Sequence, residues 1–335
     1  MEDTRISKRP RTDVSEPTKE NPSESAYEQG LVWWEDGNLV LVAEYVAFRI
    51  HKSMLARKSQ IFCDMFSIPQ PSNSDQYDGC PVVHMSDSAK DVSHVLSVLY
   101  DSEKYIDPKE GIDFDVIAAM LKLGRKYQMD QLVNLAVTLL QTLYPPTLFH
   151  YDKVLTVTFS GRRVARKTSH HISVLNLARR FELHQLLPPA FLACSQFSYQ
   201  ELVNGPPGNG EESLLSRADI ARCLTGRVQL RARWMRRLEF VQLTTPSVWC
   251  NYPARCRTAL EIWKKEHLWE FLQPSDTENA MENFYWLDRP GTTGLCELCT
   301  RFFKDGDRKA RQQTWNSLAQ IFDLEDVVEW PPQIE

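Results

Sequence analysis

The chain has 335 residues, of which 42% are hydrophobic, 39 are lysine or arginine and 44 are aspartate or glutamate. This length allows two domains of ordinary size, and the hydrophobic content is sufficient for folded cores. The formal net charge of −5 is too balanced to indicate a nucleic acid or a membrane surface as the main partner.

The first 29 residues predict a disordered tail. They are rich in Pro, Ser, Glu, Lys and Thr and contain almost no large apolar residue. Within them, Lys8-Arg9-Pro10-Arg11 is either a short nuclear-import signal or a basic cluster that arose by chance. The tail has no apolar core of a signal peptide, and Glu44 interrupts the most apolar stretch that follows. We therefore expect a cytoplasmic or nuclear protein that is neither secreted nor embedded in a membrane.

Strands and short helices are expected from about residue 31. The β-rich runs 39–42 and 45–50 are separated by a short polar break, which predicts a hairpin. Helical patterns then begin at His51 and again behind Ser59, a residue type that caps helices well. After a polar, turn-rich stretch, residues 81–85 predict a third strand.

Three longer helices are expected next. A start that resembles a capping box at Ser88 precedes the first, and Asp113 and Asp130 precede the other two. Apolar residues repeat at three- and four-residue spacing in all three, and Pro145-Pro146 ends the last. The sequence therefore predicts an α+β domain over residues 30–145, with a short three-stranded sheet flanked by a cluster of about five helices.

The stretch between the hairpin and the second short helix carries a more specific signal. It reads Phe-x-x-His-Lys-x-x-Leu-x-x-x-Ser-x-x-Phe-x-x-Met-Phe, and the fixed positions are Phe48, His51, Lys52, Leu55, Ser59, Phe62, Met65 and Phe66. This pattern resembles the signature of BTB/POZ domains, and the predicted order of elements is that of the same fold. The whole chain, with its basic tail and helical second half, also looks like the BTB-domain proteins abundant in mushroom-forming fungi.

The signature residues also have a physical interpretation. Leu55, Phe62, Met65 and Phe66 recur at intervals that place them on the inner faces of two helices. Burial of each such side chain contributes roughly 1.5–3 kcal/mol, so we expect core residues. His51 has no nucleophile or second metal ligand nearby in the sequence, which favours a structural role as a cap or a buried hydrogen-bonding group.

The resemblance implies a protein-interaction module, a scaffold or adaptor that associates with itself or with other proteins. In some members of the family it implies docking to a cullin ubiquitin ligase as a substrate adaptor. Members that bind cullins often carry an apolar-x-Glu element after the third helix, whereas Glu103 here follows the polar Asp101. Stable dimers in this family commonly use extra structure ahead of the first strand, and this chain has only residues 27–34 at that position. Cullin docking and a homodimer are therefore both left open.

The second half predicts a different kind of structure. Residues 146–170 are expected to connect the first domain to a mainly α-helical C-terminal domain over residues 171–335, with a Gly- and Pro-rich loop near 205–212. Seven of the nine tryptophans lie in this half. Because tryptophan is a large buried anchor in small helical domains, we expect most of them in its core.

A helix predicted over residues 216–241 has clustered arginines, namely Arg227, Arg231, Arg233, Arg236 and Arg237. Such a helix could contact nucleic acid through phosphates, which gives the alternative of a nuclear regulatory protein. The other interpretation is a solvated helix face whose arginines pair with acidic neighbours. No known nucleic-acid-binding motif accompanies the cluster, so nucleic acid is the less favoured partner.

Eight cysteines without a secretory signal indicate reduced thiols rather than a disulfide framework. Four of them form two pairs, Cys250-x5-Cys256 and Cys296-x2-Cys299. Four thiolates on short loops could hold a structural zinc ion in a closed tetrahedral site. The alternative is ordinary buried or surface thiols, because the first spacing is longer than zinc sites commonly use.

Common sequence signatures of enzymes are missing. The chain has no GxSxG, GxxxxGK[ST], HExxH or kinase motif, so neither an activated nucleophile nor a phosphate-binding loop can be assigned. The adjacent His170 and His171 lack an acid or metal partner evident from the sequence. We expect a protein that is not an enzyme, has no cofactor apart from the structural zinc that the cysteines could hold, and acts through protein partners.

Overall fold

The computed structural model describes residues 27–69, 75–102, 113–159, 170–206, 214–272, 281–282, 284 and 294–332. These residues fall into two units. The first is the sheet, made of residues 27–52 and 75–89, and the second contains the other described residues, which are mainly helical. The tail predicted for residues 1–29, the basic cluster at residues 8–11 and the loop near 205–212 lie largely or wholly outside the described residues.

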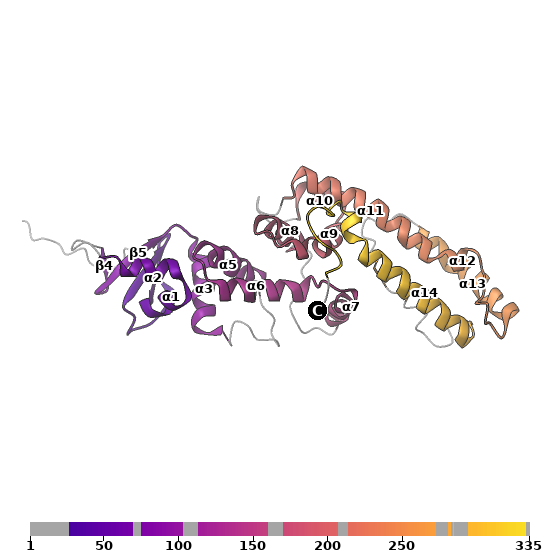
Figure 1. The fold of residues 1–335 in the computed structure, drawn as a ribbon, viewed down its shortest axis with the longest axis horizontal. Coiled ribbons are helices and arrows are strands. Elements are labelled where there is room, and N and C mark those ends of the chain that lie inside the picture. Colours follow the sequence, from indigo (N-terminus) through magenta and orange to yellow (C-terminus); the bar gives the residue numbers. More distant parts are fainter. Residues whose placement is uncertain are drawn as a thin grey trace, which may run out of the picture. The chain divides into compact units, whose positions relative to one another are not determined.

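Five strands form the sheet in the order β1-β3-β2-β5-β4 (Figure 1). β2 (Leu39–Ala43) and β3 (Val46–Ile50) are the predicted antiparallel hairpin, and β5 (Cys80–Met85) is the predicted third strand, parallel to β2. β1 (Glu28–Trp33) lies parallel to β3, and β4 (Gln76–Tyr77) lies antiparallel to β5. The prediction of three strands was therefore too low by these two edge strands.

Composition explains why β1 was missed. The strand begins with two polar residues and contains Gly30, a residue that weakens strand patterns. Packing requires this glycine, because a Cβ at position 30 would lie 2.5 Å from the ring of Phe48, and that ring is only 1% exposed. β4 has two residues, which is too short for any periodicity to be detected.

In the described residues between the hairpin and residue 144 there are five α-helices, in line with the predicted cluster of about five. They are α1 (Lys52–Lys58), α2 (Gln60–Ser67), α3 (Ala89–Tyr100), α5 (Phe114–Lys126) and α6 (Asp130–Leu143). Ser59 caps α2 by accepting a hydrogen bond from the backbone N–H of Phe62 at 3.2 Å, and Asp113 caps α5. α5 and α6 pack against each other, which follows from the apolar faces that the sequence shows.

The rest of the described chain is helical, as predicted. Its α-helices are α7 (Leu148–Phe159), α8 (His171–Arg180), α9 (Leu187–Cys194), α10 (Tyr199–Asn204), α11 (Arg217–Arg237), α12 (Glu239–Gln242), α13 (Pro253–Leu272), α14 (Glu297–Asn316) and α15 (Leu318–Ile321). Figure 1 shows α11 and α14 as long ribbons in this part. No helix in the described ranges is long and apolar enough to cross a bilayer.

α7 lies inside the stretch that was predicted only as a connecting segment. Asp152 of α7 forms an ion pair with Arg311 of α14, with one N···O distance of 3.1 Å. The Tyr151 side chain is 1% exposed, and its ring centroid lies 5.1 Å from that of Trp315. The described part of residues 146–170 therefore packs with the C-terminal helices.

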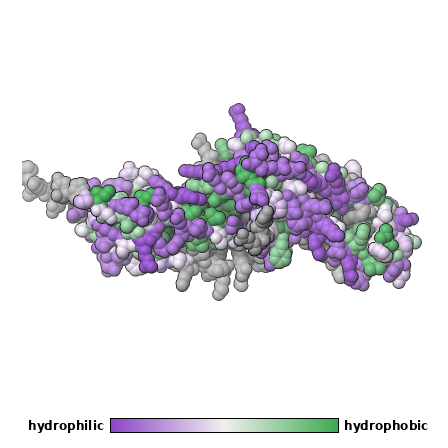
Figure 2. Space-filling view, in the orientation of Figure 1, coloured by the Kyte–Doolittle hydropathy of each residue, from purple (hydrophilic) through white to green (hydrophobic). Residues whose placement is uncertain are grey.

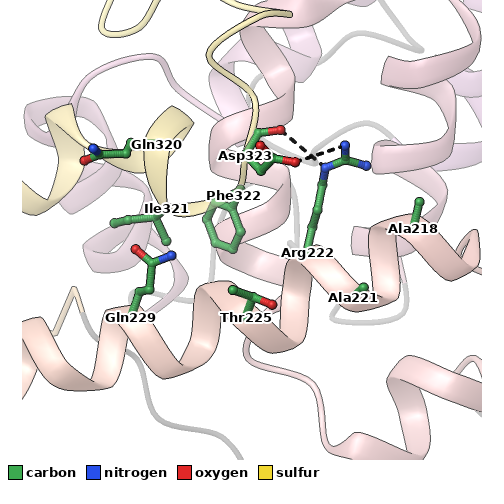
Figure 3. Close-up of a pocket in the computed structure, with 9 residues that line it drawn as sticks. All are labelled: Ala218, Ala221, Arg222, Thr225, Gln229, Gln320, Ile321, Phe322 and Asp323. Carbon is green, nitrogen blue, oxygen red and sulfur yellow. Dashed lines mark hydrogen bonds and ion pairs between the residues drawn. The ribbon is translucent and has the colours of Figure 1, made fainter.

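α11 and α15 approach each other closely at a glycine. A Cβ built on Gly226 would lie 2.2 Å from the ring of Phe322, which follows α15 and is fully buried. Figure 3 shows this ring directed toward α11 near Thr225. The absence of a side chain at position 226 therefore sets the distance between the two helices.

We expect Gly226→Ala to lower the free energy of unfolding by about 1–3 kcal/mol through overpacking, even though alanine favours a helix by roughly 0.5–1 kcal/mol over glycine. Gly306→Ala in α14 is the matched control, because a Cβ there meets nothing within 4 Å. This control should gain roughly 0.5–1 kcal/mol. Urea denaturation followed by circular dichroism measures both variants, and a stabilised Gly226→Ala protein would contradict the close packing.

Candidate functional site

The signature residues lie at the end of the hairpin and along α1 and α2. Phe48 is in β3 and is 1% exposed, and Leu55 and Ser59 are each 2% exposed. Phe62 is also buried, whereas Met65 and Phe66 are half-buried. The pattern thus combines fully buried positions with the partly covered face of a short helix.

Ser59 links α2 to the turn between α5 and α6. Its hydroxyl donates a hydrogen bond to the backbone oxygen of Tyr127 at 2.5 Å while it caps α2. The rings of Phe62 and Tyr127 stack with centroids 4.8 Å apart. One buried hydroxyl therefore fixes both the start of α2 and its position against the neighbouring helices.

His51 and Lys52 lie at the junction between strand and helix. The Nε2 atom of His51 is 3.3 Å from a carboxylate oxygen of Asp36, and its ring is 6.2 Å from that of Trp34. The backbone N–H of Lys52 donates to the side-chain oxygen of Asn38 at 2.9 Å. Asn38 therefore caps the start of α1, a role that the sequence did not reveal because the two residues are 14 positions apart.

These features define a mixed α/β domain, in which a five-stranded sheet is combined with helices and several signature residues are buried. Residues 34–144 match the family model of the BTB/POZ domain. The chain therefore contains a BTB/POZ domain, which is a protein-interaction module and is typically non-catalytic. No curated protein matches the chain.

The structure brings the four predicted C-terminal cysteines together. Their Sγ atoms all lie within 4.8 Å of one another, and those of Cys250 and Cys296 are 3.7 Å apart. Cys256 and Cys299 are fully buried, whereas Cys250 and Cys296 are half-buried. All four are free thiols. We call these residues the cysteine cluster.

Each pair of cysteines lies at the start of a helix. Cys250 precedes α13, and Cys256 is in its first turn. Cys296 is the N-cap residue of α14, and Cys299 is in its first turn. Five residues separate Cys250 from Cys256, and α13 begins between them at Pro253, so Cys250 lies before the helix and Cys256 in its first turn. A helix N-terminus carries a partial positive charge, which favours thiolates beside it.

Backbone N–H groups donate to the sulfurs of the cluster. Among the donors are Tyr252 to Cys250 at 3.4 Å, Cys296 to Cys256 at 3.3 Å, and Ser247 to Cys299 at 3.4 Å. Hydrogen bonds of this kind favour the charged form of an acceptor. The cluster is therefore surrounded by groups that stabilise negative sulfur.

The thiols of the cluster differ in their acidity. Burial raises the pKa of Cys256 and Cys299. Burial also acts on Cys296, but hydrogen bonds from the backbone of Cys299 and from the other thiols outweigh it and lower the pKa of Cys296 to about 7. One thiol of the cluster thus loses its proton more easily than a free cysteine does.

The five arginines singled out in the sequence do not form one surface. Arg227 donates to a backbone oxygen of the turn between α9 and α10 at 2.9 Å, and Arg237 is buried in an ion pair with α14 at 2.8 Å. Arg231 and Arg233 are half-buried, and Arg236 is exposed. Because the protein itself binds two of these side chains, the structure offers no observation in favour of the nucleic-acid alternative.

A pocket of about 380 Å³ lies between α11 and the residues around the end of α15 (Figure 3). Its charged lining residues are Arg222 and Asp323, and the guanidinium of Arg222 lies 3.4 Å from the carboxylate of Asp323. The remaining lining residues are apolar or carry uncharged hydroxyl and amide groups. The two charges offset each other, so we assign no reaction to this pocket.

Proposed function

We propose that the chain is a scaffold or adaptor whose BTB/POZ domain mediates self-association, while the C-terminal helices recruit a second protein. The observation that carries this proposal is the match of residues 34–144 to the BTB/POZ family model. BTB domains bind proteins and often dimerise. The physical question is therefore which surface of this domain would meet its copy.

An edge strand of the sheet supplies the surface that we favour. β1 is at one end of the strand order, and its Leu31 side chain is 85% exposed. Tyr45, which is 79% exposed, lies beside the start of β1 because its backbone oxygen accepts a hydrogen bond from the N–H of Glu28. An edge strand with exposed apolar side chains is a template for pairing with another chain. We call Leu31, Tyr45 and the half-exposed Trp34 the β1 edge.

The mass of the full chain in solution tests this proposal. Light scattering at high micromolar concentration should give about twice the chain mass of 38.8 kDa, and Leu31→Asp should shift the protein toward the monomer because a buried charge opposes pairing. Leu243→Asp is the matched control, since Leu243 is an exposed leucine of the C-terminal region. A monomeric wild-type chain would refute self-association, and a dimer that survives Leu31→Asp would refute the β1 edge.

We do not extend the proposal to cullin docking. In the BTB/POZ family that the sequence resembles, members that bind cullins often carry an apolar residue two positions before the glutamate that follows the third helix. Here the polar Asp101 occupies that position and is exposed at the end of α3. Glu103 itself lies outside the described residues.

A further inference from the structure

α13 is a long helix with a narrow buried face. Among those of its residues whose burial is described, Cys256, Leu260 and Trp263 are buried. These positions are spaced by four and three residues, so they form one stripe along the helix. Most helical stability in proteins comes from packing of such a face, and the buried face of α13 is small. The first member of the stripe belongs to the cysteine cluster.

The cluster has the dimensions of a tetrahedral metal site. Zinc–sulfur bonds of about 2.3 Å place the four sulfurs of such a site roughly 3.8 Å apart. The observed separation of Cys250 and Cys296 is 3.7 Å, and every other pair of Sγ atoms lies within 4.8 Å. A disulfide needs about 2.05 Å between sulfurs, so the four thiols are arranged around a common centre rather than as two bonded pairs.

We propose that the cysteine cluster binds one structural zinc ion, which joins the N-terminal ends of α13 and α14. Figure 1 shows these two ends at the same extremity of the C-terminal helices, and apolar atoms gather there in Figure 2. Four protein ligands fill a tetrahedral site, which leaves no position for a reacting molecule. The ion would therefore stabilise the fold, and this role is independent of the function proposed for the BTB/POZ domain.

The charge of such a site is balanced locally. Zinc with four thiolates carries a net charge of −2, since four thiols release four protons when the ion binds. Two helix N-termini and backbone N–H donors that include those of Ser247, Tyr252 and Cys296 face the sulfurs, and both kinds of group stabilise negative charge. Iron also accepts four thiolates, but zinc binds a given set of ligands more tightly than ferrous iron does.

Metal analysis of the full chain, purified without chelators, is the first test. We expect one equivalent of zinc per chain. Zinc below about a tenth of an equivalent would overturn the proposal. Iron in place of zinc would overturn the identity of the ion. A metal-free protein whose intact mass shows the loss of two hydrogens per cysteine pair would show that the cluster forms disulfides instead.

Serine variants test the ligands one by one. Cys299→Ser should lose the zinc, whereas Cys223→Ser, which alters a fully buried thiol of α11 outside the cluster, should keep one equivalent. Because Cys299 is itself buried, Cys250→Ser at the half-buried end of the cluster provides a variant with less effect on the core. We expect it to release zinc to a chelator that the wild-type chain resists. Equal resistance of this variant and the wild type would refute a four-thiolate site.

Hydrogen exchange tests whether the ion holds the two helices. Removal of zinc by a chelator should accelerate exchange of the amides in the first turns of α13 and α14, and zinc added back should restore their protection. The amides of α11 serve as the internal reference, because this helix carries none of the four cysteines. Unchanged exchange in α13 after complete loss of zinc would refute the structural role.

Discussion

Replacing Trp315 by alanine should lower the free energy of unfolding by about 3–5 kcal/mol. Trp315 lies in α14 and is completely buried. Its ring packs against Tyr151 of α7 and against Trp330, with centroid distances of 5.1 and 5.8 Å, and its Nε1–H donates to the backbone oxygen of Pro146 at 3.1 Å. The substitution leaves a cavity between Tyr151 and Trp330, and it leaves the carbonyl of Pro146 without its hydrogen-bond donor.

Trp249→Ala is the matched control, because Trp249 is 76% exposed. Its effect should stay within about 0.5 kcal/mol. Denaturation is best followed by circular dichroism, since both variants change the tryptophan fluorescence of the chain. If the two substitutions lower the free energy of unfolding equally, Trp315 is not the residue that holds α7 against α14.

The tryptophans also show what composition can and cannot predict. We expected most of those in the second half to be in its core, and Trp234, Trp263 and Trp315 are buried. Trp249 and Trp269 are exposed, and Trp286 lies outside the described residues. Helical spacing explains why Trp263 is buried and Trp269 is exposed. Trp263 is three residues after the buried Leu260 and lies on the same stripe of α13, whereas Trp269 is six residues after Trp263 and points away from that stripe.

Long-range contacts account for the largest departures from the predicted fold. Local patterns were sufficient for the hairpin, the third strand and the five described helices of the BTB/POZ domain, because each has a clear apolar period. α7 was ambiguous because its sequence ends in valines and threonines, which favour strands. Asp152 and Tyr151 hold α7 in place through contacts with residues about 160 positions away. A local sequence pattern cannot predict such contacts.

The cysteine cluster could be predicted only in part. The Cys-x2-Cys pair is a common metal-ligand spacing, and the sequence drew attention to it. The pairing with Cys250 and Cys256 depends on two helix N-termini meeting across 39 intervening residues. Sequence spacing cannot show that, so the sequence alone left zinc ligands and ordinary thiols as alternatives.

Arg237 pairs with an acidic neighbour, as one interpretation of the sequence expected, but it is buried and lies neither on a solvated helix face nor on a surface for nucleic acid. Its side chain is 1% exposed and lies 2.8 Å from the carboxylate of Asp307, while its Nη2 donates to the backbone oxygen of Glu282 at 2.5 Å. The guanidinium also lies 4.5 Å from the centroid of the Phe284 ring. Burial lowers the pKa of Arg237, and the charge of Asp307 opposes this effect. The ion pair therefore anchors the end of α11 to α14.

Removing the carboxylate should leave a buried positive charge without compensation. We expect Asp307→Ala to lower the free energy of unfolding by about 3–5 kcal/mol, and the nearby charge of Arg311, which also disfavours a charged Arg237, adds to the penalty. The double variant Arg237→Met with Asp307→Leu should recover most of this loss, because an apolar pair of similar volume avoids burying charge.

The control for this prediction is an exposed ion pair of the same helix. Asp305 and Arg308 are 3.6 Å apart, and their side chains are 49% and 76% exposed. Asp305→Ala should therefore cost no more than about 1 kcal/mol. Urea denaturation of the three variants, compared with the wild type, measures the loss of stability at the buried and at the exposed ion pair. Because solvent screens only the exposed pair, equal losses for Asp305→Ala and Asp307→Ala would show that Arg237 reaches water when its partner is removed.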